Sequence, residues 1–278
     1  MNSALVQAIS EGRCSGRVWF YSNYHCNLEC RYCLTESSPS VPRRELSLEQ
    51  MVTLAVQAKE QGFTAVGITG GEPFLLSWMV DALVQISEIL PVTVLTNGTL
   101  FQGRLLEKMN HLCRENIFVQ LSLDAPEPEK NDLFRGKTNF EKVVKAIPRL
   151  IEKGIQVRIS STMQEPSEEE RENLTQFLIS LGVKREDHVI REVVTRGRAD
   201  LDNIGIQAPL EKLPPELTLT AVGAFYSPFG PTYKNQRLQT DLLLTRTIEP
   251  ISTPLRSLLR ALGQASMLEG DEQPSGFV

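Results

Sequence analysis

The chain has 278 residues, a formal net charge of −5 and 41% hydrophobic residues. This apolar fraction is ordinary for a globular protein and excludes wholesale disorder. The sequence has no run of about eighteen apolar residues, so we expect no transmembrane helix and no membrane partner. The mildly acidic balance predicts no nucleic-acid partner. Residues 1–12 lack a basic start followed by an apolar stretch, so we expect no secretory signal and a cytoplasmic protein.

Short apolar runs rich in Val, Ile and Phe predict six buried strands. In chain order they are Arg17 to Ser22, Ala65 to Thr69, Val92 to Leu95, Ile117 to Leu121, Ile155 to Ser160 and His188 to Val194. Helices are expected between the strands. They run from Ser47 to Gly62, Ser77 to Leu90, Leu100 to Arg114, Thr138 to Gly154 and Ser167 to Gly182. This alternation implies right-handed crossovers and a parallel α/β sheet, either doubly wound or curled as in a barrel.

Capping boxes mark three of the expected helix starts. Ser47, Thr138 and Ser167 are each followed three residues later by Gln or Glu. In a capping box the first side chain accepts a hydrogen bond from an unpaired backbone amide, and the fourth side chain reaches back.

The chain changes character after Val194. The polar, proline-containing stretch from Arg196 to Leu217 is expected to be a linker, and Leu217 to Tyr226 a β-hairpin centred near Val222-Gly223. Pro254 to Leu262 is expected to form a short amphipathic helix. We therefore divide the chain into a lead-in (1–16), an α/β unit (17–198), a C-terminal extension (199–266) and a tail expected to be disordered (267–278).

Polar or glycine-rich segments follow every predicted strand. They are Asn23 to Cys33, Gly70-Gly71-Glu72-Pro73, Thr96-Asn97-Gly98, Ser122-Leu123-Asp124, Ser160-Ser161-Thr162 and Thr195 to Arg198. Because the carboxyl ends of parallel strands form the active-site face of α/β proteins, we expect these segments to meet on one rim.

Three of the five cysteines form the motif Cys26-x-x-x-Cys30-x-x-Cys33. An odd count in a chain without a visible export signal does not indicate a disulfide framework. A structural zinc site needs four ligands, and His25 is poorly placed to be the fourth. Three thiolates without an obvious fourth ligand suit a four-iron, four-sulfur cluster in which one iron remains open to a small molecule.

The other two cysteines are expected to serve packing. Cys14 precedes the first strand and is interpreted as a small, partly buried residue. Cys113 falls in phase with Leu105, Met109 and Leu112 on a predicted helix, which indicates a core position. His111 and Cys113 would complete a zinc site only if their helix turned toward the cysteine loop.

The cysteine motif after the first strand and Gly70-Gly71-Glu72-Pro73 after the second together resemble the radical S-adenosylmethionine (SAM) superfamily. The similarity extends over roughly Arg17 to Arg198. It implies a partial (β/α)6 TIM-like barrel, followed in this chain by a short C-terminal β-hairpin plus helix extension.

The resemblance implies one [4Fe-4S] cluster, ligated by Cys26, Cys30 and Cys33, and S-adenosyl-L-methionine bound to its open iron. The residues assigned to cofactor binding are Tyr32, Gly70, Gly71, Glu72, Pro73, Asn97, Ser122 and Arg135. Tyr32 would neighbour the adenine, Glu72 would accept a hydrogen bond from the ammonium, and the glycines would let the backbone approach the methionyl group. Ser122 and Arg135 would hold the carboxylate or the ribose.

Further candidates rest on their positions near the rim. Asp124 is the candidate catalytic residue, contacting substrate or taking a proton, with capping of the next segment as the alternative. Arg158, Ser160 and Thr162 are secondary candidates, because alternate strand residues face a barrel interior. Arg196 and Arg198 are candidates for binding an anion, although we expect at least one of them to be a solvated charge.

In the implied chemistry, the reduced cluster passes one electron to SAM, and the resulting 5′-deoxyadenosyl radical abstracts hydrogen from substrate. An electron donor such as flavodoxin or ferredoxin is then implied. The segment from Leu217 to Pro231 resembles the hairpin of the SPASM or twitch extensions of peptide-modifying members. No cysteine follows Cys113, so no auxiliary cluster is expected. The aromatic residues of and after this hairpin are interpreted as a small satellite core rather than a pocket lining. They are Phe225, Tyr226, Phe229 and Tyr233.

We favour a maturase that acts on a peptide or protein substrate, because of the hairpin. A radical SAM enzyme of small-molecule metabolism or cofactor biosynthesis is the alternative. A non-catalytic zinc-binding protein is the more distant alternative.

Overall fold

The computed structural model describes residues 2–209 and 212–270, with the side chains of 264–270 excepted. Its centre is a parallel sheet in which six strands follow one another in chain order. They are β1 (Arg17–Tyr21), β2 (Ala65–Thr69), β3 (Val92–Thr96), β4 (Ile117–Ser122), β5 (Gln156–Met163) and β6 (His188–Glu192). The predicted parallel α/β fold is therefore confirmed, with each strand within a few residues of its expected range.

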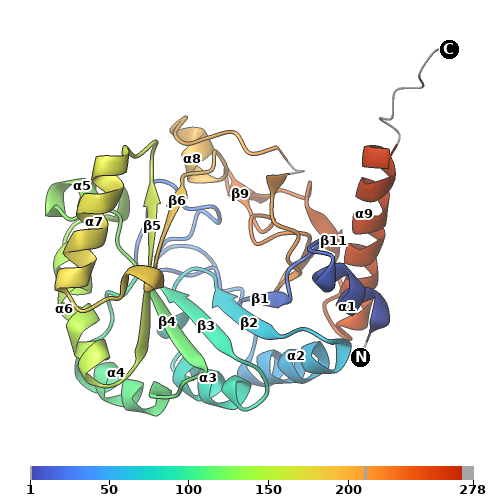
Figure 1. The fold of residues 1–278 in the computed structure, drawn as a ribbon, viewed down its shortest axis with the longest axis horizontal. Coiled ribbons are helices and arrows are strands. Elements are labelled where there is room, and N and C mark those ends of the chain that lie inside the picture. The colour runs from blue at the N-terminus through green and yellow to red at the C-terminus, as the bar shows by residue number, and fades with distance from the viewer. Residues whose placement is uncertain (1, 210–211, 271–278) are drawn as a thin grey trace.

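Helices cover the outer side of this sheet, as Figure 1 shows. They are α2 (Leu48–Gln61), α3 (Met79–Ser87), α4 (Gly103–Lys108), α6 (Asn139–Glu152) and α7 (Glu168–Ser180). Two short helices, α5 (Pro128–Arg135) and α8 (Arg198–Leu201), lie in loops that follow β4 and β6. Three turns of 3₁₀-helix span Pro73–Leu75, Met109–Leu112 and Arg185–Asp187.

The capping boxes at Ser47 and Ser167 are both formed. The box expected at Thr138 is not, because Thr138 adopts a left-handed conformation and its side chain makes no capping bond. Asp132 caps this helix instead, since its carboxylate accepts hydrogen bonds from the backbone amides of Thr138 at 2.6 Å and Phe140 at 2.8 Å.

The interpretation of Cys113 as a core residue is wrong, because its side chain is exposed. Helix α4 ends at Lys108 and a 3₁₀ turn follows, so the 3.6-residue phase from Leu105 does not reach Cys113. Cys14 is a packing residue, as expected, but it is buried rather than partly buried.

The C-terminal extension continues the same sheet beyond β1. Strand β7 (Thr218–Thr220) pairs in parallel with β1, and β8 (Gly223–Phe225) returns antiparallel to β7, which confirms the predicted hairpin. Strand β11 (Leu243–Thr245) pairs with β8 at the edge of the sheet. A separate ribbon is formed by β9 (Tyr233–Lys234) and β10 (Arg237–Leu238).

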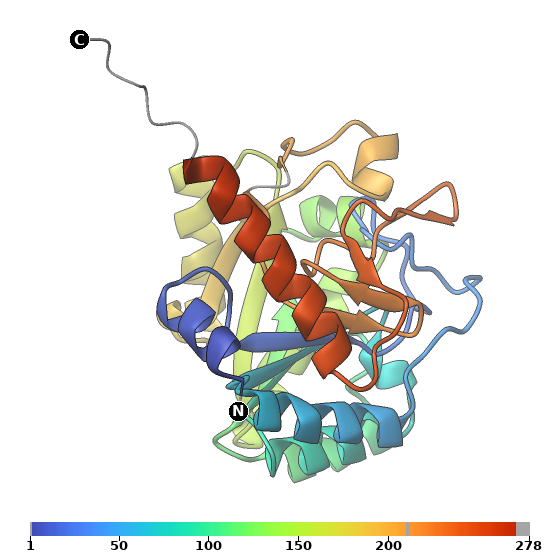
Figure 2. The same ribbon diagram turned by 90° about the vertical axis from the view of Figure 1, so that its right-hand side faces the viewer.

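Helix α9 (Ser252–Gly270) is longer than the predicted helix from Pro254 to Leu262. Figure 2 shows it running across the side of the molecule with α1 (Ser3–Ser10) beside it. Leu5 of α1 and Leu255 of α9 both belong to the main hydrophobic core. The end of the expected tail, residues 271–278, lies outside the described residues.

The two faces of the parallel strands have different surroundings. In β1, Val18 and Phe20 belong to the core, whereas Arg17, Trp19 and Tyr21 line a cavity of about 540 Å³ on the other face. Since successive side chains of a strand point to opposite faces, this alternation positions the cavity inside the curved sheet. Within residues 2–209 and 212–270, no helix is long and apolar enough to cross a membrane.

Candidate functional site

The cysteine motif lies in the long loop between β1 and α2, and the turn after β2 packs directly against this loop. The amide of Gly71 donates to the carbonyl of Asn23 at 2.8 Å, and the amide of Glu72 donates to the carbonyl of His25 at 2.9 Å. A Cβ atom at Gly71 would lie 2.1 Å from the His25 carbonyl oxygen, and one at Gly70 would lie 2.3 Å from that of Asn23. The two glycines therefore allow the β2 turn to approach the backbone of the cysteine loop, a reason that the sequence did not reveal.

The three motif thiols lie close enough together to interact electrostatically. Burial and the charge of Glu72 contribute most to disfavouring the thiolate form of Cys26. The neighbouring Cys30 and Cys33 disfavour it further. Burial is the main reason that the pKa of Cys26 rises to about 12 and that of Cys30 to about 11. Both thiols are therefore protonated at neutral pH in the metal-free chain. A bound metal displaces such protons, because a coordinating thiol is deprotonated.

Polar groups already face the motif sulfurs. Cys26 Sγ accepts from the amide of Leu28 at 3.4 Å and from Asn97 Nδ2 at 3.7 Å. Cys33 Sγ lies 3.4 Å from the hydroxyl of Thr35. Donors aimed at sulfur stabilise a thiolate and tune a cluster, so these surroundings fit iron–sulfur ligation. Among the described residues, no three His, Cys, Asp or Glu side chains are arranged around a single metal-ion position.

Arg198, which follows β6, fastens the cysteine loop from the opposite side. Its guanidinium donates to the carbonyls of Cys30 at 3.1 Å, Glu36 at 2.9 Å and Ser37 at 2.8 Å. Its backbone amide also donates to the carbonyl of Cys33 at 3.0 Å. Arg198 is thus neither a solvated charge nor free to bind an anion. Arg196 is likewise engaged, in a two-point ion pair with Asp241.

Glu72 is fully buried and connects the β2 turn to the end of β3. Its carboxylate accepts from the Phe74 amide at 3.0 Å, the Thr96 hydroxyl at 2.8 Å and the Asn97 amide at 2.8 Å. Burial raises the pKa of Glu72 to about 7, although these hydrogen bonds oppose the shift. The structure thus shows a connecting role for Glu72, and its predicted contact with the cofactor ammonium stays a prediction.

Asn97 also supports the cysteine loop. Besides its contact with Cys26, its Nδ2 donates to Asn27 Oδ1 at 2.9 Å, and its Oδ1 accepts from the hydroxyl of Thr99 at 2.7 Å. The side chain of Asn97 is therefore directed at a motif thiol and its neighbours, and its assignment to SAM binding stays a prediction.

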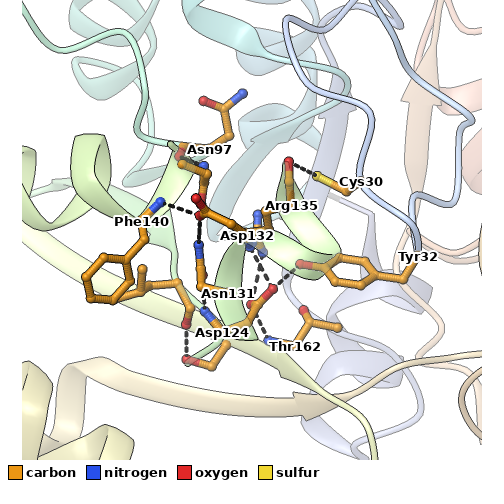
Figure 3. A network of polar contacts seen from close by, with 12 residues as sticks. Cys30, Tyr32, Asn97, Asp124, Asn131, Asp132, Arg135, Phe140 and Thr162 are labelled. Atoms are coloured by element: carbon orange, nitrogen blue, oxygen red, sulfur yellow. Dashed lines mark hydrogen bonds and ion pairs between the residues drawn. The ribbon is translucent and has the colours of Figure 1, made fainter. Parts of the chain in front are cut away.

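Asp124 lies at the centre of a buried network at the end of β4 (Figure 3). Its carboxylate forms a two-point ion pair with Arg135 and accepts from the amide of Thr162 at 2.9 Å. The hydroxyl of Tyr32, inside the cysteine motif, also donates to this carboxylate. Burial raises the pKa of Tyr32 well above its usual range, so its hydroxyl remains a donor.

Arg135 joins this network to the cysteine loop. Cys30 Sγ lies 3.8 Å from the carbonyl of Arg135, and the Arg135 guanidinium lies 5.4 Å from the centre of the Tyr32 ring. Asn131, which the sequence did not single out, accepts from the Asp124 amide at 3.0 Å. The structure therefore brings Tyr32, Asp124 and Arg135 together. Ser122 pairs with Ser160 in the sheet, two residues before Asp124.

The large cavity opens beside the cysteine motif. Its wall near the motif is formed by Tyr32, Cys33, Thr69, Gly70 and Thr162. The cavity is also lined by Arg17, Trp19, Arg191 and Glu216, and the C-terminal extension contributes Pro228 and Phe229. One motif cysteine, one glycine of the β2 turn and the barrel interior thus share a single cavity.

The aromatic residues of the extension are divided between two environments. Phe225 is fully buried, and Tyr226 packs partly buried against the main and satellite cores, as predicted. Phe229 lines the large cavity, and Tyr233 lines a second cavity of about 400 Å³. The satellite-core interpretation is therefore correct for Phe225 and Tyr226, and incomplete for the other two.

Comparison with known proteins gives sequence relatives of two kinds. Residues 21–178 match the sequence profile of the radical SAM superfamily. The subtilosin biosynthesis protein AlbA of Bacillus subtilis is 34% identical over 167 residues, which are 59% of this chain and 37% of AlbA. A probable GTP 3′,8-cyclase of Archaeoglobus fulgidus is 36% identical over 132 residues, 47% of this chain and 43% of the cyclase. This chain thus spans less than half the length of either relative.

Solved structures show the same fold. Streptococcus suis SuiB bound to S-adenosylmethionine superposes with a TM-score of 0.57 at 20% identity, over 68% of this chain and 44% of SuiB. The structure of anSMEcpe with bound AdoMet gives a TM-score of 0.63 at 13% identity, over 87% of this chain and 80% of anSMEcpe. These likenesses agree with the partial (β/α)6 TIM-like barrel expected for the six parallel strands. Because the profile match covers more than half of the 278 residues and contains the cysteine motif, this chain belongs to the radical SAM superfamily.

Proposed function

We propose that this protein binds one [4Fe-4S] cluster through Cys26, Cys30 and Cys33 and uses it to cleave SAM reductively. The observation that carries the proposal is the shared cavity, whose wall contains both Cys33 and Gly70. When bound, the cluster and SAM supply a 5′-deoxyadenosyl radical that abstracts hydrogen from a substrate. Family membership argues against the alternative of a non-catalytic zinc protein.

The protein's own residues position the reactants and exclude water. Arg198 and the β2 turn hold the cysteine loop from two sides, which fixes the three thiols relative to the cavity. Pro214, Pro228 and Phe229 from the C-terminal extension line the same cavity. We propose that this apolar wall keeps solvent hydrogen donors away from the reacting atoms. In this account Asp124 and Arg135 position Tyr32, and Asp124 does not itself transfer a proton.

We propose a peptide or protein as the substrate. Relatives include AlbA, named for bacteriocin biosynthesis, and SkfB of Bacillus subtilis, named for maturation of a sporulation killing factor. SuiB was also solved bound to the precursor peptide SuiA, with a TM-score of 0.58 to this chain. The match to the GTP 3′,8-cyclase supports a small-molecule substrate as the second candidate. We further propose a flavodoxin or ferredoxin as electron donor, a cytoplasmic location and no auxiliary cluster.

The test is anaerobic reconstitution with iron and sulfide, followed by reduction and addition of SAM. We expect a brown protein with about four irons per chain that releases 5′-deoxyadenosine and methionine in equal amounts. A colourless protein that retains one zinc ion and releases neither product would overturn the proposal. Deuterium transfer from labelled candidate peptides into 5′-deoxyadenosine would then separate peptide from small-molecule substrates.

A further inference from the structure

The large cavity is lined by two arginines, Arg17 and Arg191, whose side chains have no hydrogen-bond or ion-pair partner among the described residues. Arg17, at the start of β1, makes no hydrogen bond or ion pair through its side chain with any described residue, and its Nε is buried. Its guanidinium instead lies 5.3 Å from the centre of the Trp19 ring. Arg191 of β6 also lines this cavity, and it is exposed. A buried guanidinium nitrogen without a hydrogen-bond acceptor is costly, so the position of Arg17 needs an explanation.

Two carboxylates lie near Arg17 and Arg191 without forming an ion pair to either of them among the described residues. Arg191 is influenced by the carboxylate of Glu216 and by the positive charge of Arg17, so the three groups lie near one another. The carboxylate of Glu216 accepts a hydrogen bond from the indole of Trp19 and is ion-paired to neither arginine. Glu192, the other carboxylate along the cavity, follows Arg191 on the strand and is exposed. The cavity lining thus holds two arginines and two glutamates, and within the described residues neither carboxylate is ion-paired to either arginine.

An unpartnered amide donor accompanies the arginines. Nε2 of the buried Gln120 has no hydrogen-bond partner among the described residues. Gln120 is the register partner of Leu95, which lines the cavity, so the two side chains lie on the same face of the sheet. The unpaired donors Arg17 Nε and Gln120 Nε2 thus lie on the cavity side of the sheet, where a ligand with acceptor oxygens would satisfy them.

We propose that Arg17 and Arg191 bind a carboxylate of the substrate, such as a Glu or Asp side chain of a peptide. Guanidinium groups match a carboxylate in a two-point geometry, and the proposed peptide substrate would supply carboxylates from its Glu and Asp side chains. Arg17 precedes Tyr21 by four residues, about 13 Å along the strand, and Tyr21 pairs with Thr69 next to Gly70. The carboxylate would therefore anchor the substrate deep in the cavity, with its C–H bonds toward the cysteine motif.

This inference rests on the proposed function, and the first measurement separates the two. Reconstituted wild-type protein is assayed for 5′-deoxyadenosine from SAM without any peptide. If the product does not form, the proposed function fails, whatever the peptides do. If 5′-deoxyadenosine forms, the cluster-loaded, SAM-bound protein is used for the peptide-binding measurements. A negative binding result would then contradict only the carboxylate site.

Binding is measured by anaerobic calorimetry with two isosteric probes, N-acetyl-Ala-Glu-Ala-amide and its Gln counterpart. We expect the Glu peptide to bind at least about tenfold more tightly than the Gln peptide, because a hydrogen-bonded charge pair is lost in the latter. Arg17→Gln and Arg191→Gln are each expected to remove most of this preference. Arg149→Gln, an equal charge change on the exposed side of α6, should retain it. Arg191 is exposed, so its variant provides the test if Arg17→Gln does not fold.

Glutarate and inorganic phosphate identify the source of the anionic group. Glutarate binding as tightly as the Glu peptide would support the carboxylate site and assign it to a small-molecule substrate. Phosphate displacing the Glu peptide more effectively than glutarate would overturn the proposal. Equal binding of the two peptides, binding of neither at millimolar concentration, or an unchanged preference in both arginine variants would also overturn it.

Discussion

Asp124 and Arg135 form a buried two-point ion pair, with 2.7 Å between Arg135 Nε and Asp124 Oδ2 and 3.1 Å between Nη2 and Oδ1. Tyr32 of the cysteine motif donates to the same carboxylate. The pair therefore connects the end of β4, helix α5 and the cysteine loop. Asp124 was predicted to act in catalysis and Arg135 to bind the cofactor, but the two side chains neutralise each other's charge.

Removing one member of this pair should destabilise the metal-free protein strongly. Asp124→Asn leaves the buried Arg135 without a counter-charge, and we expect unfolding free energy to fall by about 3–5 kcal/mol. The double variant Asp124→Leu/Arg135→Met should be more stable than the single variant, because no unpaired charge remains. Urea denaturation measures both.

Glu141→Gln provides the control, since its ion pair with Lys145 is exposed on α6. We expect it to cost less than about 1 kcal/mol. A cost for Asp124→Asn similar to that of Glu141→Gln would contradict the assignment of a buried, stabilising pair.

The close approach of the β2 turn to the cysteine loop should be sensitive to a single methyl group. In Gly71→Ala the added Cβ would lie 2.1 Å from the His25 carbonyl oxygen, which is backbone and cannot move independently of the loop. We expect the variant to take up less than half of the wild-type iron on reconstitution, measured by iron and sulfide analysis. Gly263→Ala is the control, because no atom of the described residues, apart from its chain neighbours and the nearby backbone of its own helix, lies within 4 Å of its added Cβ. Full iron uptake by Gly71→Ala would show that the loop adjusts freely.

Arg198 should control how firmly the cluster is held. Arg198→Met removes the guanidinium bonds to the carbonyls of Cys30, Glu36 and Ser37. Hydrogen bonds from a charged group contribute about 1.5–3 kcal/mol, so we expect iron release to a chelator to accelerate about tenfold or more. Arg196→Met, an equal change in a residue bound to Asp241, should release iron at the wild-type rate. Equal rates for the two variants would remove Arg198 from this role.

His188 should make stability fall in mild acid. Burial, assisted by the positive charge of Arg185, lowers the pKa of His188 to about 4. Its Nε2 lies 2.9 Å from the hydroxyl of Ser161, and its Nδ1 lies 2.9 Å from the hydroxyl of Thr175. Between about pH 6.5 and 4 the unfolded chain takes up a proton that the folded chain does not. Stability should therefore be fully present above pH 6.5 and decline below it, by at most about 1.4 kcal/mol per pH unit.

Denaturation at several pH values measures this slope. We expect His188→Gln to reduce it, and the exposed His111→Gln to leave it as in the wild type. An unchanged slope in His188→Gln would mean that other groups produce the acid sensitivity.

The strands and most helices were predictable because their signals are local. Buried parallel strands are continuous apolar runs, and the box at Ser47 needs only Gln50, three residues away. The box at Thr138 failed because Asp132, which lies outside the predicted helix, captures the amides of Thr138 and Phe140. Local patterns predict an element, but they do not reveal a competing cap from a neighbouring loop.

The site was predictable only where a motif marks it. The motif residues Tyr32, Cys33 and Gly70 do meet at one cavity. The roles of Arg198 and Glu72 depend on contacts across the fold, such as the bond from Arg198 to Cys30, 168 residues apart in the chain. No spacing or periodicity encodes such a contact. The position of Arg17, whose Nε has no hydrogen-bond partner among the described residues, was likewise not predictable, because it becomes evident only once the cavity is formed.

The central claim, that the three motif cysteines hold a cluster that cleaves SAM, is tested most directly by 5′-deoxyadenosine formation in cysteine variants. Cys30→Ala and Cys113→Ala each remove one thiol, the first from the motif and the second from an exposed position outside it. After anaerobic reconstitution and reduction, we predict that Cys30→Ala lacks both the cluster absorbance and the product, whereas Cys113→Ala retains both. Product formation by Cys30→Ala at the wild-type rate would contradict the account.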